Sequence, residues 1–304
     1  MKRLIVILLA GTALLATACG PAQSGTLGPA PTGARGIGTT PAPGQSSGVA
    51  PSSGIASASP GARTEPPATI TIEVWFTRGE RIFLTHRTRP ATVATSRLAL
   101  TELIAGPSGL ETAAGVGNAV PFDTTFTVSV SGGVATVGLP GWFYDTSRAR
   151  ARLRQAQVVY TLTQFATVSR VGFQKDGQPT AAPVGRADYA DLLPKIIVID
   201  PVIGQRVSSP VTVAGMAEVY ESTVSMRLLD AAGKEIVSAF TTAACVPRCA
   251  FEFSGPGHGN FSTAVSYRLS REQPGTVQVF ETSPEDGSQR NLVNIPVVLA
   301  ASGG

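Results

Sequence analysis

The sequence predicts an α+β domain, a small mainly antiparallel sheet with two helices, followed by an all-β immunoglobulin-like sandwich. Three observations lead to this prediction. In residues 68–183, short β-branched runs alternate with two segments of helical spacing. In residues 195–300, such runs follow one another without a convincing helix. Residues 19–67, ahead of both, are rich in Gly, Pro, Ser and Ala. The two folded domains are therefore joined by a linker at residues 184–194.

The N-terminus has the layout of a secretory signal, so residues 1–18 are predicted to be a signal peptide. A cationic start, Met1 to Arg3, precedes an apolar run from Leu4 to Leu15 that is too short to span a bilayer comfortably. Cys19 follows directly after small residues, which resembles a bacterial lipobox. The resemblance implies that Cys19 is diacylated and anchors the chain to the membrane. An ordinary cleaved signal, giving a soluble secreted protein, is the alternative.

Residues 19–67 contain no aromatic side chain and little apolar surface. Such a segment cannot offset the entropy of ordering, so we expect a disordered tether. A tether behind a lipid anchor would lift the folded domains off the membrane. We interpret it as a spacer without a recognition role of its own.

The first domain is expected to run in the order strand pair, helix, hairpin, helix, strand. The expected strands are Thr69–Thr77, Arg81–Thr85, Phe126–Val130, Val134–Leu139 and a last strand or hairpin from Val171. The expected helices are Thr95–Ile104, stopped by Gly106-Pro107, and a longer one from the N-cap Ser147 to about Thr167. This order makes a sandwich with both helices on one face of the sheet.

This order and these residues resemble the GerMN domain, named from a sporulation and spore-germination protein. The likeness is carried by Val74-Trp75-Phe76, Leu98–Pro107, Val120-Pro121, Gly133–Val137 and Val159–Phe165. The sequence departs from the pattern at Phe122-Asp123-Thr124, where the family has a glycine turn. The family resembles ring-building modules of envelope assemblies and has no established catalytic residues, so none is carried over.

The second domain is expected to contain only short strands. They are Lys195–Asp200, Val211–Val219, Val224–Leu229, Ile236–Thr242, Ala250–Phe253, Thr263–Leu269, Thr276–Phe280 and Asn294–Leu299, with turn residues between them. The sequence of this domain resembles the Gmad2 domain, an immunoglobulin-like module that often follows GerMN. That likeness is carried by Ile197–Pro201, Ser208–Gly215, Ala217–Val224, Glu285–Ser288 and Val293–Val298.

Two cysteines remain after lipidation, Cys245 and Cys249. In an oxidising compartment, two cysteines so close together are predicted to form a small-loop disulfide. A redox-active pair is less favoured, because the familiar motif has two intervening residues. A metal site with His258 lacks a fourth ligand, and His86 lies on the other domain, so no metal site is predicted.

Four arginines, Arg148, Arg150, Arg152 and Arg154, form the sharpest charge run. On a helix they would make a basic collar, and they are candidate contacts for an anionic partner such as teichoic acid, a lipid headgroup or a protein. A solvated helix flank is the alternative, and the one we favour. The aromatic group Trp142-Phe143-Tyr144 is expected to cap the core, with an exposed binding surface as its alternative.

The formal net charge of +4 is modest, and no dense basic stripe suggests a nucleic-acid partner. No phosphate loop, nucleophile elbow or carboxylate pair predicts catalysis or a cofactor. The sequence therefore predicts a non-catalytic envelope lipoprotein, a scaffold that contacts the membrane through its lipid and an envelope protein or cell-wall partner. A lipoprotein that binds a wall fragment or small solute between its domains is the alternative, and a cell-wall enzyme is a third, weaker one.

Overall fold

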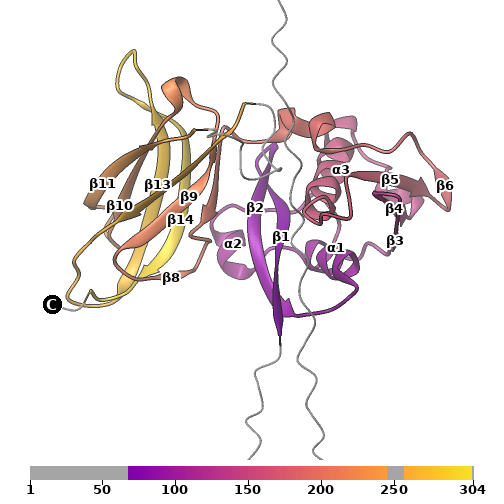
Figure 1. Cartoon of the computed structure of the whole chain (residues 1–304), viewed down its shortest axis with the longest axis horizontal. Helices are drawn as coiled ribbons and strands as arrows, with labels where there is room; N and C mark the ends of the chain where they lie inside the picture. Colours follow the sequence, from indigo (N-terminus) through magenta and orange to yellow (C-terminus); the bar gives the residue numbers. More distant parts are fainter. Residues whose placement is uncertain (1–67, 245–256, 303–304) are drawn as a thin grey trace, which may run out of the picture. The chain divides into compact units, whose positions relative to one another are not determined.

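The computed structural model describes residues 68–244 and 257–302 of the chain (Figure 1). These residues belong to one compact unit, which spans residues 63–304. No helix in the described ranges is long and apolar enough to cross a bilayer. The α+β domain and the β-sandwich expected from the sequence are both confirmed.

The first domain begins with a long antiparallel hairpin. β1 (Thr69–Arg78) pairs along its whole length with β2 (Arg81–Pro90), and Gly79 in the turn has a φ of +61°. Most side chains in the second half of β1 are buried, with Trp75 and Phe76 at 0% exposure. β2 continues five residues beyond the expected end at Thr85, because its whole length pairs with β1.

Three helices pack against the hairpin, and one of them, α3, also contacts the second sheet. They are α1 (Thr95–Ala105), α2 (Gly109–Ala113) and α3 (Arg148–Leu162). α1 ends at Gly106, whose φ of 84° lies in the left-handed region that glycine adopts without strain. α3 begins after Ser147, whose hydroxyl accepts a hydrogen bond from the N–H of Arg150, as expected of an N-cap.

A four-stranded sheet completes the first domain, in the order β3-β4-β5-β6. Its strands are β3 (Thr127–Ser131), β4 (Val134–Leu139), β5 (Arg170–Lys175) and β6 (Gln178–Pro179). β4 and β5 pair in parallel, and the other pairs are antiparallel. Gly132 and Gly133, both at positive φ, make the tight turn between β3 and β4.

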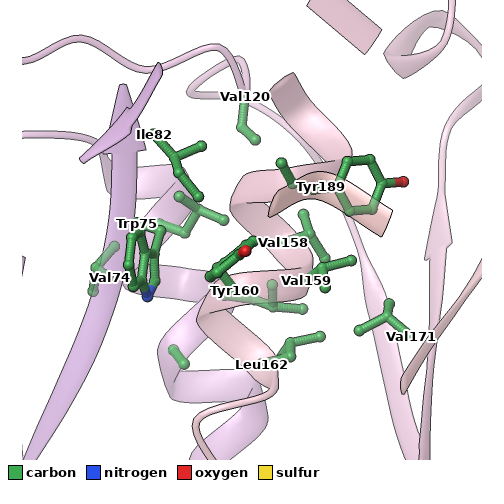
Figure 2. Packing of buried hydrophobic residues seen from close by; sticks show 14 of the residues in the cluster. Val74, Trp75, Ile82, Val120, Val158, Val159, Tyr160, Leu162, Val171 and Tyr189 are labelled. Atoms are coloured by element: carbon green, nitrogen blue, oxygen red, sulfur yellow. The ribbon is translucent and has the colours of Figure 1, made fainter. Parts of the chain in front are cut away.

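The core of this domain lies around α3, which contacts β1, β2, β5 and α1. Figure 2 shows Trp75 of β1 beside Tyr160 of α3, with ring centroids 4.9 Å apart. Val158, Val159 and Leu162 lie on the same helix and are buried as well (Figure 2). Burial of large apolar and aromatic side chains stabilises the domain mainly through the hydrophobic effect.

The second domain consists of two sheets. Its strands are β7 (Ile196–Asp200), β8 (Arg206–Val207), β9 (Val211–Ala217), β10 (Thr223–Leu229), β11 (Glu235–Thr242), β12 (Gly259–Val265), β13 (Gln273–Thr282) and β14 (Gln289–Leu299). One sheet has the order β11-β10-β13-β14-β8 and the other β12-β9-β7. Gly215 on β9 lets β7 approach closely, because a Cβ there would lie 2.0 Å from the carbonyl oxygen of Ile197.

Several expected boundaries are corrected by the structure. α3 ends at Leu162 instead of about Thr167, and β12 lies at Gly259–Val265 where a strand at Thr263–Leu269 was expected. The short helix α2 was not expected, nor were the 3₁₀ helices η1 (Gly141–Phe143), η2 (Arg186–Leu192) and η3 (Tyr220–Ser222). The expected strand Ala250–Phe253 lies outside the described residues.

The strands of the first domain also form two sheets where one was expected. The reason lies in contacts between distant segments. β1 pairs with β2 on one side, and polar side chains of α3 and of Gln164, together with the backbone of Gly117, occupy its other side. A helix, and not a strand, therefore closes that edge.

Candidate functional site

The outer edge of β1 is closed by two side chains of α3, those of Gln157 and Thr161, and by Gln164 just beyond its end. At Thr77 the same edge also pairs with the backbone of Gly117. Gln164 accepts from the N–H of Glu73 and donates to its C=O, both at 2.7 Å. Thr161 accepts from the N–H of Trp75 at 3.1 Å, and Gln157 donates to the carbonyl of Trp75 at 2.9 Å. Gln157 and Thr161, four residues apart, share one face of the helix, and Gln164 follows two residues after the helix ends. They satisfy backbone groups that a neighbouring strand would otherwise pair.

Gln157 is the most connected of the three. It is fully buried, and its Oε1 also accepts from the N–H groups of Ala119 and Val120 at 3.0 and 3.3 Å. Its Nε2 donates to Asn118 as well, at 2.9 Å. Gln157 therefore joins β1, α3 and the segment before β3 through one buried amide.

The hairpin is also tied to α2 by a buried carboxylate. Glu111 is 3% exposed and accepts from the hydroxyl of Thr85 at 2.6 Å, from the N–H of Ser108 at 2.7 Å and from both terminal nitrogens of Arg87. Burial by itself would raise the pKa of the Glu111 carboxyl, but the hydrogen bonds from Arg87, Thr85 and Ser108 and the charge of Arg87 lower it to about 2. Glu111 is thus ionised in the folded domain at neutral pH.

β3 presents the opposite situation, because its outer edge is open. β3 pairs with β4 only, and no hydrogen bond from its backbone to any other described residue is found. In an antiparallel pair every second residue turns its N–H and C=O away from the partner strand. The strand Thr127–Ser131 contains neither a charge nor a proline, and Val130 is 40% exposed. The other edge strand of the sheet, β6, is two residues long and ends at Pro179, which blunts it.

A groove of about 250 Å³ lies where β2, β7 and β14 meet. Its lining residues are Arg78, Arg81, Ile82, Phe83, Leu84, Pro194, Lys195, Ile196, Ile197, Val198, Asn291, Leu292 and Val293. Most of them are aliphatic or aromatic. Leu292 stands at the surface with 43% exposure, and Phe83 is half-buried with the guanidinium of Arg78 4.2 Å from its ring centroid.

The charged side chains of this groove are all cationic. Arg78 donates to the carbonyls of Ala114 and Asn294 at 3.1 and 3.4 Å, and burial lowers the pKa of its guanidinium. Arg81 donates to two carbonyls of the linker, those of Asp191 and Leu193. These acceptors are neutral, and among the described residues no ion pair within 4.0 Å involves Arg78 or Arg81.

The third cation of the groove, Lys195, pairs with Glu218 at 2.9 Å, and Glu218 is not a lining residue. The described lining contains no carboxylate, imidazole, hydroxyl or thiol. The groove therefore offers apolar contact and positive charge, which suits binding, and no nucleophile or acid–base pair of the usual kind. Sequence reasoning missed Arg78, Arg81 and Lys195, because no local motif signals residues that meet only through folding.

The structure separates the four arginines of the sequence-predicted collar. Arg148 and Arg150 are exposed at the start of α3. Arg152 forms an ion pair with Asp191 at 2.8 Å. Arg154 is 8% exposed, and its guanidinium donates to the carbonyls of Ala119 and Phe143 inside the domain. A continuous basic surface is therefore absent in this described part, and only Arg148 and Arg150 offer the open surface expected of anionic-partner contacts.

The aromatic group divides between core and surface. Phe143 is 1% exposed, whereas Trp142 is 42% exposed. His86 lies on β2, half-buried, and Nε2 of His258 donates to the carbonyl of Pro194 at 2.9 Å. No cluster of three metal-ligating side chains occurs among the described residues. Cys19, Cys245 and Cys249 lie outside the described residues.

Two protein-family models match the chain. Residues 70–181 match the Germane family, described as "Sporulation and spore germination". Residues 195–288 match the Gmad2 family, described as "Immunoglobulin-like domain of bacterial spore germination". The groove is lined from both matched regions. No curated protein matches the chain.

Solved structures give weaker likenesses. The tandem GerMN domains of the sporulation protein GerM from Bacillus subtilis share 14% identity over 78% of this chain, with a TM-score of 0.36, and the match spans 62% of that structure. The first GerMN domain of the same protein shares 22% identity over 38% of this chain and 90% of its own length, with a TM-score of 0.31. A putative lipoprotein from Clostridium perfringens shares 15% identity over 40% of this chain and 89% of its own, with a TM-score of 0.28. Likenesses of this strength transfer no residue role.

Proposed function

We propose that this chain is a non-catalytic envelope lipoprotein that acts as an interaction or scaffold module at the outer face of a bacterial membrane. In this proposal, Cys19 carries the lipid, residues 19–67 form the tether, and the two domains present surfaces to an envelope protein or cell-wall partner. The matches to two spore-germination families support a non-catalytic module of the sporulation and germination type. A disulfide between Cys245 and Cys249 belongs to the same proposal, since the location is oxidising.

The observation that carries this proposal is the open edge of β3. An extended segment of a partner can add to such an edge as a further strand, with main-chain hydrogen bonds supplying affinity. β3 has no charge or proline that would disfavour the addition. The solvent-facing Thr127 and Ser129 would contribute side-chain hydrogen bonds to a neighbouring strand.

A crosslinked pull-down from intact cells tests the proposal. The wild-type chain should recover defined envelope proteins, and Cys19→Ala should reduce their recovery because the chain loses its anchor. Val130→Lys should remove the same proteins by placing a charge on the open edge. Val93→Lys is the matched control, because Val93 is fully exposed in the loop before α1.

The scaffold proposal fails if only peptidoglycan or a small solute is recovered. The role of β3 fails if Val130→Lys and Val93→Lys recover the same proteins in equal amounts. Because both variants replace an exposed valine with lysine, a general effect of the added charge would affect them equally.

A second candidate function, binding of a small ligand, is favoured by the groove at β2, β7 and β14. Its lining is mostly apolar and includes Arg78 and Arg81, whose hydrogen-bond acceptors among the described residues are backbone carbonyls. A pocket of this kind commonly combines apolar walls with a few polar groups that orient a ligand. Recovery of a small solute with the purified chain would favour this candidate.

A further inference from the structure

We propose that the groove at β2, β7 and β14 binds a single-chain amphiphilic anion, with its alkyl chain along the apolar lining and its carboxylate or phosphate against Arg78 and Arg81. This inference rests on the second candidate function, because it names the ligand class of that groove.

The size and lining of the groove favour a single alkyl chain as the apolar part of the ligand. Its volume of about 250 Å³ is below the ~300–1,000 Å³ of pockets that enclose drug-sized ligands. Phe83, Leu292 and Val293 supply partly exposed apolar surface, and Ile197 and Val198 lie beneath them. One alkyl chain matches such a narrow apolar space. A wall saccharide or a folded peptide is too large and too polar for it.

The charges of the groove favour an anionic headgroup on the ligand. The three ionic lining side chains are cationic, and no carboxylate lines the groove within the described residues. The Nε of Arg78 is buried and has no hydrogen-bond partner among the described residues. A buried N–H without an acceptor is unfavourable, and an anionic oxygen is the strongest acceptor that a guanidinium can bind.

Arg81 adds a second, more accessible cation. It is exposed, and its guanidinium donates to two neutral carbonyls at 2.5 and 2.9 Å. The carboxylate of Asp191, the residue whose carbonyl Arg81 contacts, is bound by Arg152 in a two-bond contact at 2.8 and 2.9 Å. The positive charge of Arg81 is therefore available to an anion, whereas an alkylammonium would meet three like charges.

Photolabelling of the full chain in lipid nanodiscs tests this inference, because no free detergent then competes for the groove. The probes are decanoate, decyl phosphate and decyltrimethylammonium, each with a diazirine at the chain end, and inorganic phosphate is the competitor without a chain. Mass spectrometry of the digested chain measures labelling of β2, β7 and β14. We expect the anionic probes to label these strands about tenfold more than the ammonium probe. If only decanoate or only decyl phosphate labels these strands, the inference is supported and the headgroup is identified.

Two pairs of variants assign the labelling to the groove. Arg81→Gln should reduce labelling by decanoate about tenfold, and Arg271→Gln, an exposed arginine outside the lining, should not. Leu292→Glu should reduce it as well, by adding a like charge at the surface of the groove. Its control is Phe240→Glu, at a residue 76% exposed on β11. Circular dichroism checks that each variant is folded.

Equal labelling by all three probes overturns the anionic class and leaves the groove as a general apolar site. Absence of labelling on the three strands overturns both the ligand class and the second candidate function. Neither result affects the scaffold proposal, which the pull-down tests separately.

Discussion

The outer edges of β1 and β3 belong to the same domain, but the backbone is hydrogen-bonded to other residues along the first and is open along the second. Along β1, the backbone groups of Glu73 and Trp75 bond to Gln157 and Thr161 of α3 and to Gln164 just beyond its end. Along β3, no described residue beyond β4 pairs with the backbone. A helix can thus replace a strand at a sheet edge when it carries amide and hydroxyl side chains on one face, and an edge without such a helix remains free for a partner.

The closed edge depends on polar side chains that are buried, and the open edge does not. Gln157 and Thr161 are fully buried. Losing either one leaves backbone groups without partners in an environment where water cannot replace them. Substitutions at the closed edge should therefore lower the stability of the domain, and substitutions at the open edge should alter only what binds there.

The largest effect is expected for Gln157→Leu. The change removes four hydrogen bonds of the buried amide and leaves the carbonyl of Trp75 and the N–H of Ala119 unpaired. We expect a loss of about 4 kcal/mol in the free energy of unfolding, measured by denaturant titration. Gln155→Leu, on the same helix but half-exposed, should lose less than about 1 kcal/mol. Equal losses would mean that the closed edge contributes little.

The next largest effect concerns the ionic contact that ties the hairpin to α2. Glu111→Gln leaves the Arg87 charge without its carboxylate, and we expect a loss of about 3 kcal/mol at neutral pH. The control is Glu285→Gln, whose pair with Arg290 lies at the surface, where solvent screens it, so the variant should lose much less stability than Glu111→Gln.

The same carboxylate predicts an acid dependence. The pKa of Glu111 is lowered in the folded state from 4.5 to about 2, so its contribution to stability is complete above pH 4.5 and is lost as the pH falls toward 2. The unfolding free energy of the wild type should fall through this window more steeply than that of Glu111→Gln. Parallel pH profiles would contradict the assignment.

A smaller effect is expected for Thr161→Val, which keeps the shape of the side chain and removes one acceptor. The N–H of Trp75 then has no partner on α3, and we expect a loss of about 1–2 kcal/mol. Hydrogen exchange at the Trp75 amide should accelerate more than at amides of β4. Uniform acceleration across the domain would argue against a local role at this edge.

The smallest effect on stability is expected at the open edge. Val130→Lys should change the unfolding free energy by less than about 0.5 kcal/mol, because Val130 is 40% exposed and no closing element depends on it. A loss above about 2 kcal/mol would show that the edge is covered in the folded chain, and would remove the basis for partner addition at β3.

Sequence reasoning was most successful where the pattern is local. The β1–β2 and β3–β4 hairpins, α1 with its glycine stop and the Ser147 cap of α3 all follow from periodicity and turn residues. It was less successful where a side chain bonds to a segment that is distant in the sequence. α3 ends at Leu162, earlier than expected, and the following Gln164 bonds to the backbone of Glu73 on β1. Arg154 was expected on the surface and instead donates to carbonyls in the interior.

The sequence by itself determined the two-domain organisation, the α+β and β-sandwich classes and most strands, because these depend on side-chain periodicity and on turn chemistry between near neighbours. Only the tertiary structure decided which edge is closed and which is open, and which cations meet in the groove. The physical reason is that both depend on pairing between distant segments. Gln157 satisfies the carbonyl of Trp75, and Arg81 and Lys195 line the same groove, only because folding brings distant segments together.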